Sequence, residues 1–282
     1  MQFTKSIEEV CTGKDVLLFA VPSVFVRGTT AKARPYIPDG QILVDVAKGM
    51  EPDTLYTMTE VIADELNRDG GPKNCRLVAL SGPTHAEEVA LDLPTTIVSA
   101  CPDDEAACFV QDVFSNTCMR VYTNPDIKGV ELSGALKNVI ALGVGISTGL
   151  GYGDNARAAL ITRGIAEIAR LGVAMGCNIH TFAGLAGIGD LIVTATSMHS
   201  RNKILIGKGE SPEQAVKEVG MVVEGINALP AAMELAAKYN VEMPIVQTVN
   251  AIVKEGMSAS DALRTLMDRN RKNEMPQGYE NI

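Results

Sequence analysis

The chain has 282 residues, of which 46% are hydrophobic and 21% are charged. This composition excludes an intrinsically disordered chain, and the length suffices for two domains that each bury a core. The formal net charge of -9 argues against nonspecific binding to nucleic acid or to an anionic membrane, because both depend on clustered Lys and Arg. An anionic substrate would therefore need a local basic pocket.

Cysteine usage and the N-terminus bear on the cellular compartment. Six cysteines are scattered without a Cys-x-x-Cys motif, and three histidines accompany them. Buried reduced thiols of a cytoplasmic protein are favoured over metal ligands or disulfides. No stretch reaches the ~18 apolar residues of a membrane span, and the first residues contain no signal-peptide core. We expect a cytoplasmic protein without a membrane span.

The first part of the chain alternates short apolar runs with helical stretches. Apolar runs bounded by Pro, Gly or charge fit strands that are buried on both faces of a parallel or mixed sheet. This alternation predicts a Rossmann-like, doubly wound α/β domain over residues 1–125. The predicted strands are 15–21, 41–47, 76–80, 95–99 and 119–122, and the predicted helices are 24–36, 53–68 and 103–114.

After the Asn124-Pro125 turn, residues 126–282 predict helices only. Leu132, Leu136 and Val139 recur at helical spacing and define an apolar face, from which Lys137 is expected to point away. The next helix is expected to be capped by Asp154 and to carry an ion pair between Arg163 and Glu167. A third helix start is predicted at Ser211-Pro212.

Lys137 is the first candidate catalytic residue. A lysine on a helix is most often solvated, but the small neighbours Gly134 and Ala135 leave space for a ligand or a backbone to approach. Partial desolvation would lower the pKa of this lysine towards values useful in acid-base catalysis. Asp190 follows a Gly-x-Gly turn, and it is either a helix cap or a carboxylate partner for such a lysine.

Ser200, Arg201 and Asn202 form a candidate phosphate site. The planar guanidinium of arginine matches a phosphate, and the neighbouring hydroxyl and amide could complete the contact. The alternative is a loop arginine in a surface ion pair. The segment between Asp190 and this group is rich in small polar residues rather than in charge, which favours a binding role.

Three loops follow predicted strands, at the edge where open α/β sheets bind ligands. They are residues 21–23, the Lys48-Gly49 pair and residues 81–86. Lys48 could bind a phosphate, and Gly82 and Thr84 could present a backbone NH and a hydroxyl. Each feature also has a simpler explanation: a proline that ends a strand, a solvated lysine and a turn with a helix cap.

Four motifs together resemble the bacterial type of NAD(P)-dependent glycerol-3-phosphate dehydrogenase. They are Ser-Gly-Ala-Leu-Lys-Asn at 133–138, Gly-Asp at 189–190 followed by Ser-Arg-Asn at 200–202, Ser-Gly-Pro-Thr-His-Ala at 81–86, and Val-Val-Glu-Gly at 222–225. The resemblance implies interconversion of sn-glycerol 3-phosphate and dihydroxyacetone phosphate, which supplies glycerol phosphate for phospholipid synthesis. It also implies NAD or NADP as cofactor and an all-α C-terminal domain like that of 6-phosphogluconate dehydrogenase.

The resemblance also implies roles for individual residues. Lys137 would exchange the proton at the C2 oxygen, and Asp190 would orient that lysine and tune its pKa. The implied substrate contacts are Lys48, Gly82, Thr84, Lys137, Asp190, Ser200, Arg201 and Asn202. The implied cofactor contacts are Lys48, Ala86, Arg201, Val222 and Glu224. No metal is implied, and the apolar helical half would suit a homodimer.

One expected motif is missing. Residues 1–48 contain no Gly-x-Gly-x-x-Gly turn for the cofactor pyrophosphate, and the match at 151–156 follows a helix, so we interpret it as a false positive. We expect that the chain starts after the first βαβ unit, through either a late start or a real truncation, with strand edges and apolar faces exposed. The alternatives are a non-catalytic remnant or partner-binding protein, and a reductase for another hydroxy acid.

Overall fold

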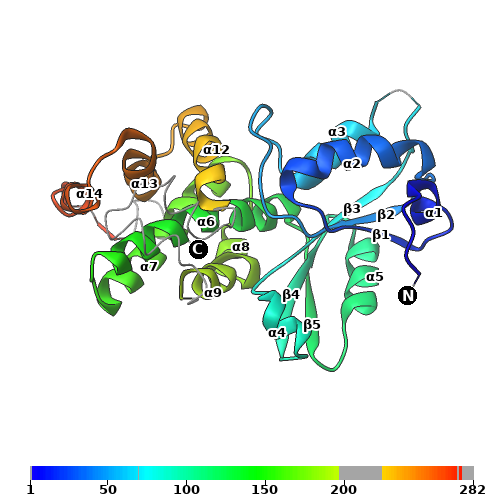
Figure 1. Ribbon diagram of the computed structural model, residues 1–282, viewed down its shortest axis with the longest axis horizontal. Helices are drawn as coiled ribbons and strands as arrows, with labels where there is room; N and C mark the ends of the chain where they lie inside the picture. The colour runs from blue at the N-terminus through cyan, green and yellow to red at the C-terminus, as the bar shows by residue number, and fades with distance from the viewer. Residues whose placement is uncertain (1, 69, 197–223, 272, 275–282) are drawn as a thin grey trace.

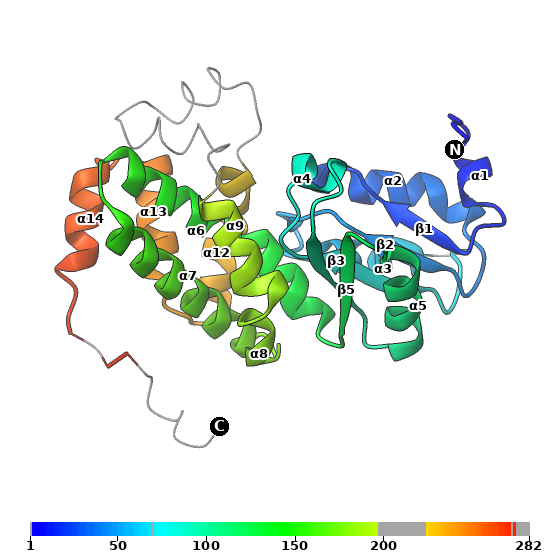
Figure 2. The same ribbon diagram turned by 90° about the horizontal axis from the view of Figure 1, so that it is seen from below.

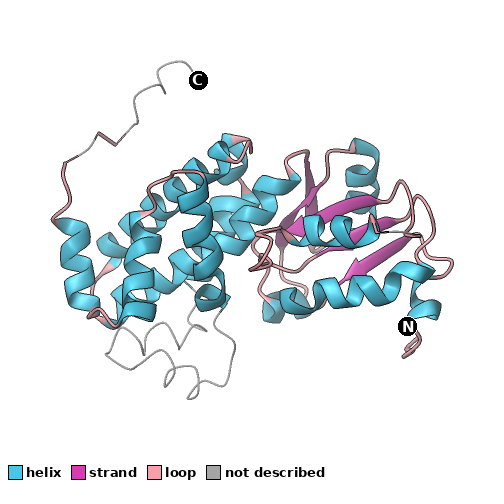
Figure 3. Ribbon diagram, turned by 90° about the horizontal axis from the view of Figure 1, so that it is seen from above, coloured by secondary structure: helices cyan, strands magenta, loops and turns pink. Residues whose placement is uncertain are grey.

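The computed structural model describes residues 2–68, 70–196, 224–271 and 273–274, which form a sheet-containing lobe and a helical lobe (Figure 1). The described strands all lie in one lobe (Figure 3). The last of them ends at Asn124, and a long helix begins at Ile127. The division of the chain into residues 1–125 and 126–282 stays our prediction.

Five strands form one mixed sheet in the described part of the chain, in the order β1-β2-β3-β4-β5. The first three strands are parallel to one another, β4 is antiparallel to β3, and β5 is parallel to β4. The five predicted strands are confirmed. Their bounds are Val16–Phe19 for β1, Ile42–Asp45 for β2, Arg76–Ser81 for β3, Thr95–Ala100 for β4 and Met119–Asn124 for β5.

Helices cover both faces of this sheet (Figure 1). Alternate side chains point to opposite faces of a strand, so Leu43 packs with the core against α2 and α3, whereas Ile42 and Val44 pack with the core against α5. This arrangement confirms the Rossmann-like fold. The helices of this lobe are α1 Ile7–Cys11, η1 Ser23–Phe25, α2 Val26–Ala33, η2 Arg34–Tyr36, α3 Met58–Leu66, α4 Ala86–Ala90 and α5 Asp104–Phe114.

The predicted helices at 24–36 and 103–114 are confirmed, but the one predicted from residue 53 begins later. Leu55 has a φ of 61°, which no helix residue adopts. A capping box between Thr57 and Glu60 then starts α3. Helices α1 and α4 were not predicted, because each has only five residues and is too short to show a helical period. Leu18 of β1, which is an edge strand of the described sheet, is 48% exposed.

The second lobe is helical throughout the residues described, as predicted. A connection at 150–153 joins its first two helices, so the glycine pattern at 151–156 does follow a helix. Ser211-Pro212 lies outside the described residues. The elements are α6 Ile127–Gly149, α7 Asp154–Ala174, α8 Ile179–Phe182, the π-helix η3 Leu185–Gly189, α9 Asp190–Thr196, α12 Glu224–Lys238, α13 Pro244–Glu255 and α14 Ala259–Met267.

The central element of this lobe is α6, which extends from the sheet into the helical lobe (Figure 2). It contacts β3, α7, α9, α12 and α13, so side chains on all of its faces are buried. Lys137 is therefore only 5% exposed, and the prediction that it points away from the buried face is wrong. The apolar spacing identified the helix correctly, but it could not show that the remaining faces are covered as well.

Two polar predictions in α7 are also wrong. The N-cap of α7 is Gly153, and Asp154 is the first helical residue, where its carboxylate pairs with Arg157 at 2.8 Å. Glu167 is 2% exposed, and its carboxylate accepts hydrogen bonds from the backbone NH groups of Ile245 and Val246 at the start of α13. This buried carboxylate, which we expected in an ion pair with Arg163, instead satisfies free NH groups at a helix N-terminus.

Two helical stretches of the described chain are long and apolar enough to cross a membrane. They are Ile127–Gly149, where 94% of the most apolar window is buried inside the protein, and Ile179–Thr196, where 33% is buried. The first is α6, whose apolar character is explained by its place at the centre of the lobe. The second is made of α8, η3 and α9. The expected absence of a membrane span thus stays a prediction.

Candidate active site

Two lysines and an aspartate meet where the two lobes contact each other. The Nζ of Lys137 donates to Asp190 Oδ1 at 2.5 Å, and the Nζ of Lys48 donates to Asp190 Oδ2 at 2.8 Å. Lys137 and Asp190 are 5% and 1% exposed, and the Lys48 side chain is 19% exposed. A buried carboxylate thus bridges two ammonium groups, only one of which reaches towards solvent.

Lys48 is positioned by the sheet. It follows the carboxyl end of β2, and its Nζ also donates to the carbonyl of Gly82, which follows the neighbouring strand β3. Gly82 has a φ of +151°, and a Cβ there would lie 3.0 Å from Ile97 Cα, so only glycine fits this position. Gly134 of α6 lies beside the Lys48 side chain, whose Cγ would be 3.5 Å from an added Cβ.

Asp190 is positioned by a break in the helical lobe. It is the first residue of α9, directly after η3, where Gly187 has a non-helical ψ of -105°. A Cβ on Gly187 would lie 2.2 Å from the carbonyl oxygen of Phe182, so this close approach also requires glycine. The Gly-x-Gly turn of the sequence therefore holds Asp190 against α6, where its carboxylate meets Lys137.

Thr194 is a second hydrogen-bond partner of Lys137, and our sequence predictions did not include it. Its Oγ1 accepts a hydrogen bond from Lys137 Nζ at 2.8 Å and donates one to the carbonyl of Asp190 at 2.7 Å. The available signal was its spacing, because a residue four positions after Asp190 lies on the same helix face. Lys137 Nζ is thus held by a carboxylate and a hydroxyl.

Burial lowers the pKa of Lys137 from its usual value to about 8. Desolvation is the largest cause, and the nearby positive charge of Lys48 adds to it, while Asp190 opposes both by favouring the ammonium form. An ammonium with this pKa still carries its proton at neutral pH and gives it up readily. Such a group can serve as a general acid in one direction and as a general base in the other.

Asn138, which follows Lys137 on α6, forms a second polar contact with Glu224. The Asn138 side-chain amide donates to Glu224 Oε2 at 2.6 Å, which connects α6 to the first residue of α12. Gly225 makes this contact possible, because a Cβ there would lie 2.5 Å from the carbonyl oxygen of Asn138. Glu224, a predicted cofactor contact, is exposed next to the buried site.

The remaining predicted site residues divide into two groups. Thr84 and Ala86 are exposed beyond the end of β3, and the Thr84 hydroxyl donates to the carbonyl of Gly82, which also binds Lys48. The structure thus brings together Lys48, Gly82, Lys137 and Asp190, with Thr84 beside them. The predicted residues Ser200, Arg201, Asn202 and Val222 lie outside the described part of the chain.

The described residues offer a nicotinamide dinucleotide an unpartnered hydroxyl and exposed apolar side chains, but no glycine-rich loop for its pyrophosphate. Ser81 Oγ, at the carboxyl end of β3, is buried without a hydrogen-bond partner among them, and the apolar Val24 and Phe25 are 73% and 61% exposed after β1. A polar ligand with a flat apolar ring would satisfy both features. In the described chain, the turn after β1 is Ala-Val-Pro-Ser at 20–23, which contains no glycine-rich loop for a pyrophosphate.

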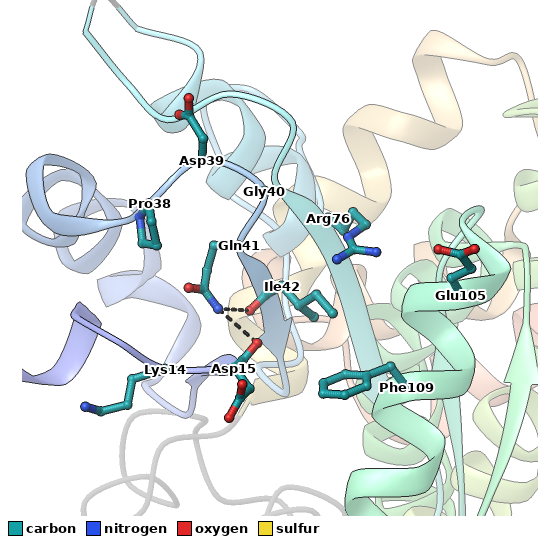
Figure 4. Close-up of a pocket in the computed structure, with 10 residues that line it drawn as sticks. All are labelled: Lys14, Asp15, Pro38, Asp39, Gly40, Gln41, Ile42, Arg76, Glu105 and Phe109. Carbon is teal, nitrogen blue, oxygen red and sulfur yellow. Dashed lines mark hydrogen bonds between the residues drawn. The ribbon is translucent and has the colours of Figure 1, made fainter.

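A pocket of about 510 Å³ lies elsewhere on the sheet lobe. It is lined at the amino ends of β1, β2 and β3, where Gln41 donates to the carbonyls of Asp15 and Ile42 (Figure 4). Open α/β sheets bind their ligands at the carboxyl ends of the strands. The pocket is therefore at the edge opposite to Lys48 and Gly82, and none of the predicted site residues lines it.

A Rossmann-like sheet followed by a helical lobe, with a buried lysine and carboxylate where the two meet, defines the class of two-domain dehydrogenases. The sequence patterns of the N-terminal and C-terminal parts of NAD-dependent glycerol-3-phosphate dehydrogenase match residues 1–107 and 126–264 of the chain. The chain belongs to the NAD-dependent glycerol-3-phosphate dehydrogenase family, which confirms the resemblance noted in its sequence.

Individual relatives agree with this assignment. A protein of Lactobacillus delbrueckii subsp. bulgaricus named glycerol-3-phosphate dehydrogenase NAD(P)+ 2 is 66% identical over 98% of this chain and 82% of its own length. A glycerol-3-phosphate dehydrogenase NAD(P)+ of Fusobacterium nucleatum is 51% identical over the same shares. The crystal structure of glycerol-3-phosphate dehydrogenase from Coxiella burnetii is similar with a TM-score of 0.86 and 33% identity, covering 94% of this chain and 80% of that one.

Proposed function

We propose that this protein reduces dihydroxyacetone phosphate to sn-glycerol 3-phosphate with NADH or NADPH, and catalyses the reverse oxidation. The observation that carries this proposal is the buried Lys137 ammonium, held by Asp190 and Thr194 at the carboxyl edge of a Rossmann-like sheet. Membership of the family supports the choice of substrate and cofactor. The product would supply glycerol phosphate for phospholipid synthesis.

The chemistry needs one proton at one oxygen atom. The nicotinamide, when bound, supplies the hydride that reaches C2 of the substrate. The C2 carbonyl oxygen then becomes an alkoxide, and we assign its protonation to Lys137 Nζ, which is left as a neutral amine. In the oxidation, the neutral amine accepts the hydroxyl proton from the same oxygen. Because Lys137 is buried, little water competes with the C2 oxygen for a hydrogen bond from Lys137 Nζ.

Asp190 and Lys48 have different roles in this proposal. Asp190 holds the Lys137 ammonium in place and limits the fall in its pKa. Lys48 shares the carboxylate and is the more exposed lysine, so we propose that it contacts the substrate. The assignment of the other residues follows the family resemblance: Gly82, Thr84, Ser200, Arg201 and Asn202 for the substrate, and Lys48, Ala86, Arg201, Val222 and Glu224 for the cofactor.

The pKa of Lys137 predicts opposite pH dependences for the two directions. Reduction needs the ammonium, so kcat/KM for dihydroxyacetone phosphate should fall as the pH rises through about 8, whereas kcat/KM for glycerol 3-phosphate should rise through the same pH. Lys48→Met removes a positive charge that lowers this pKa, so both midpoints should move to higher pH. Midpoints that stay in place in the variant would contradict the electrostatic role of Lys48.

The phosphate assignment is tested at Arg201. Hydrogen bonds from an arginine to an anionic group contribute about 1.5–3 kcal/mol, so Arg201→Ala should raise the KM for dihydroxyacetone phosphate by about tenfold or more. Arg163→Ala, at an exposed position of α7, is the matched control and should leave KM unchanged. An unchanged KM in Arg201→Ala would favour a reductase for a different hydroxy acid.

Two alternatives are less well supported. A non-catalytic remnant has no need for a buried ammonium held by two partners, since such a charge is costly to desolvate. Ketopantoate reductases, which act on another class of substrate, include a structure from Ralstonia eutropha that is similar with a TM-score of 0.53 and 13% identity, a likeness that shows the fold alone.

The cellular location and the assembly are further proposals. All six cysteines are free, which supports a reducing compartment such as the cytoplasm. A homodimer through the helical lobe stays a prediction from the apolar composition of that lobe. Binding of a small anionic substrate is consistent with the local pair of lysines in a chain of net charge -9.

A further inference from the structure

Glu131 lies on α6, the helix that carries Lys137, and its side chain crosses to the sheet lobe. Its carboxylate accepts hydrogen bonds from Thr57 Oγ1 at 2.8 Å, from the Thr59 backbone NH at 2.8 Å and from Thr59 Oγ1. Glu131 is 7% exposed. Hydrogen bonds to a charged acceptor are strong, and a buried carboxylate without partners would be costly. The three donors therefore fix the position of the Glu131 carboxylate.

The donors belong to the start of α3. Thr57 is the N-cap, and its backbone NH donates to Glu60 Oε2 at 2.9 Å in the capping box. The Thr57 hydroxyl and the Thr59 NH, which has no helical acceptor in the first turn, are thus turned towards Glu131. Burial raises the pKa of Asp45, at the end of β2, to about 8, and the negative charge of Glu131 raises it as well. Glu131 therefore binds the point where the chain enters α3.

The segment that precedes α3 carries Lys48. It leaves β2 after Asp45 and closes on itself through a bridge between Met50 and Thr57, with the NH of Glu51 donating to the carbonyl of Tyr56 at 2.9 Å. Leu55, which follows the turn of this loop, is 8% exposed and packs in the core of the helical lobe. Residues 46–57 are thus attached to the helical lobe by the polar contact of Thr57 with Glu131 and by the apolar contact of Leu55.

We propose that Glu131 is a positioning residue that holds the segment 46–57 against α6, and thereby places Lys48 at the carboxylate that it shares with Lys137. This inference rests on the function proposed above for Lys48. A single helix, α6, then determines the positions of both lysines. It carries Lys137, and it holds the segment of Lys48 through Thr57 and Thr59. No substrate or cofactor contact is required of Glu131 itself.

The test compares Glu131→Ala with Glu167→Ala in the full chain. Glu167 is an equally buried carboxylate with bonds to backbone NH groups, but it joins α7 to α13 within the helical lobe. Glu131→Ala should lower kcat/KM for dihydroxyacetone phosphate by about tenfold or more, because small displacements of a contact group are costly. Glu167→Ala should lower the Tm similarly and change kcat/KM by less than about twofold.

A double-mutant cycle separates positioning from general destabilisation. If Glu131 acts through Lys48, adding Glu131→Ala to Lys48→Ala should lower kcat/KM by less than about a further twofold. Fully additive losses would overturn the proposal. Glu131→Gln, which can still bond the threonines, should recover most of the loss. If Glu131→Ala does not fold, Thr59→Val removes one of the three bonds from the opposite side, and the same cycle applies.

Amide hydrogen exchange of residues 46–59 provides a readout that does not depend on activity. Exchange should be faster in Glu131→Ala than in the wild type, and unchanged in Glu167→Ala. Equal exchange in the two variants would overturn the proposal. If the wild type showed no turnover at all, the proposed function would fail, while the exchange result would still decide whether Glu131 holds the segment.

Discussion

Lys137→Met should lower turnover of dihydroxyacetone phosphate by about 100-fold or more, because the alkoxide at C2 would lose its proton donor. The methionine fills nearly the same volume in the buried site, and Asp190 keeps Lys48 as a partner at 2.8 Å, so the protein should stay folded. The affinity for NADH, measured by titration, should stay within about twofold, since the assigned cofactor contacts do not include Lys137.

Lys128→Met is the matched control for this variant. Lys128 also lies on α6 and is paired with a carboxylate, Glu60, at 3.0 Å, but its side chain is 36% exposed. Its replacement should leave turnover unchanged within about twofold. Turnover of Lys137→Met within tenfold of the wild type would show that another group protonates the C2 oxygen.

Asp190→Asn should reduce both stability and turnover. The variant leaves Lys137 and Lys48 close together without the carboxylate that neutralises them, and loss of one partner of a buried ion pair costs about 3–5 kcal/mol. Repulsion from Lys48 would lower the pKa of Lys137 further, so the proton donor would be lost at neutral pH. Urea unfolding and steady-state rates measure the two effects.

Two further variants test whether unneutralised charge causes the loss of stability in Asp190→Asn. In the Asp190→Asn background, Lys48→Met should recover part of the stability, because one of the two unneutralised charges is removed. Asp154→Asn changes an aspartate at the same place in its helix, but this side chain is 91% exposed and should contribute less than about 1 kcal/mol. Normal stability and turnover of Asp190→Asn would contradict the role given to the carboxylate.

The sheet was predictable because its strands are continuous apolar runs bounded by turn residues. Val44 and Val78, which pack in one core, each lie in such a run. The burial of Lys137 was not predictable from spacing, since the apolar period of α6 identifies one face, and the covering of the others depends on α9, α12 and the sheet. The same limit applies to Glu167, whose partners are backbone NH groups of a distant helix.

The candidate site residues were predicted from their types and from family resemblance rather than from their contacts. Lys48 and Asp190 are 142 positions apart in the sequence, and no local pattern shows that their side chains form a salt bridge. Thr194 had a detectable signal in its spacing from Asp190, whereas Glu131 had none, because its donors belong to the other lobe. Long-range polar contacts of this kind depend on how the lobes pack.

We propose that this chain itself catalyses hydride transfer from NADH or NADPH to dihydroxyacetone phosphate, at the site formed by Lys137, Asp190 and Lys48. The most direct measurement mixes the 282-residue protein with NADH, and separately with NADPH, and follows oxidation of the cofactor with and without dihydroxyacetone phosphate. We predict oxidation only when the substrate is present, and its loss in Lys137→Met. A folded protein that binds the substrate but oxidises neither cofactor would contradict the account.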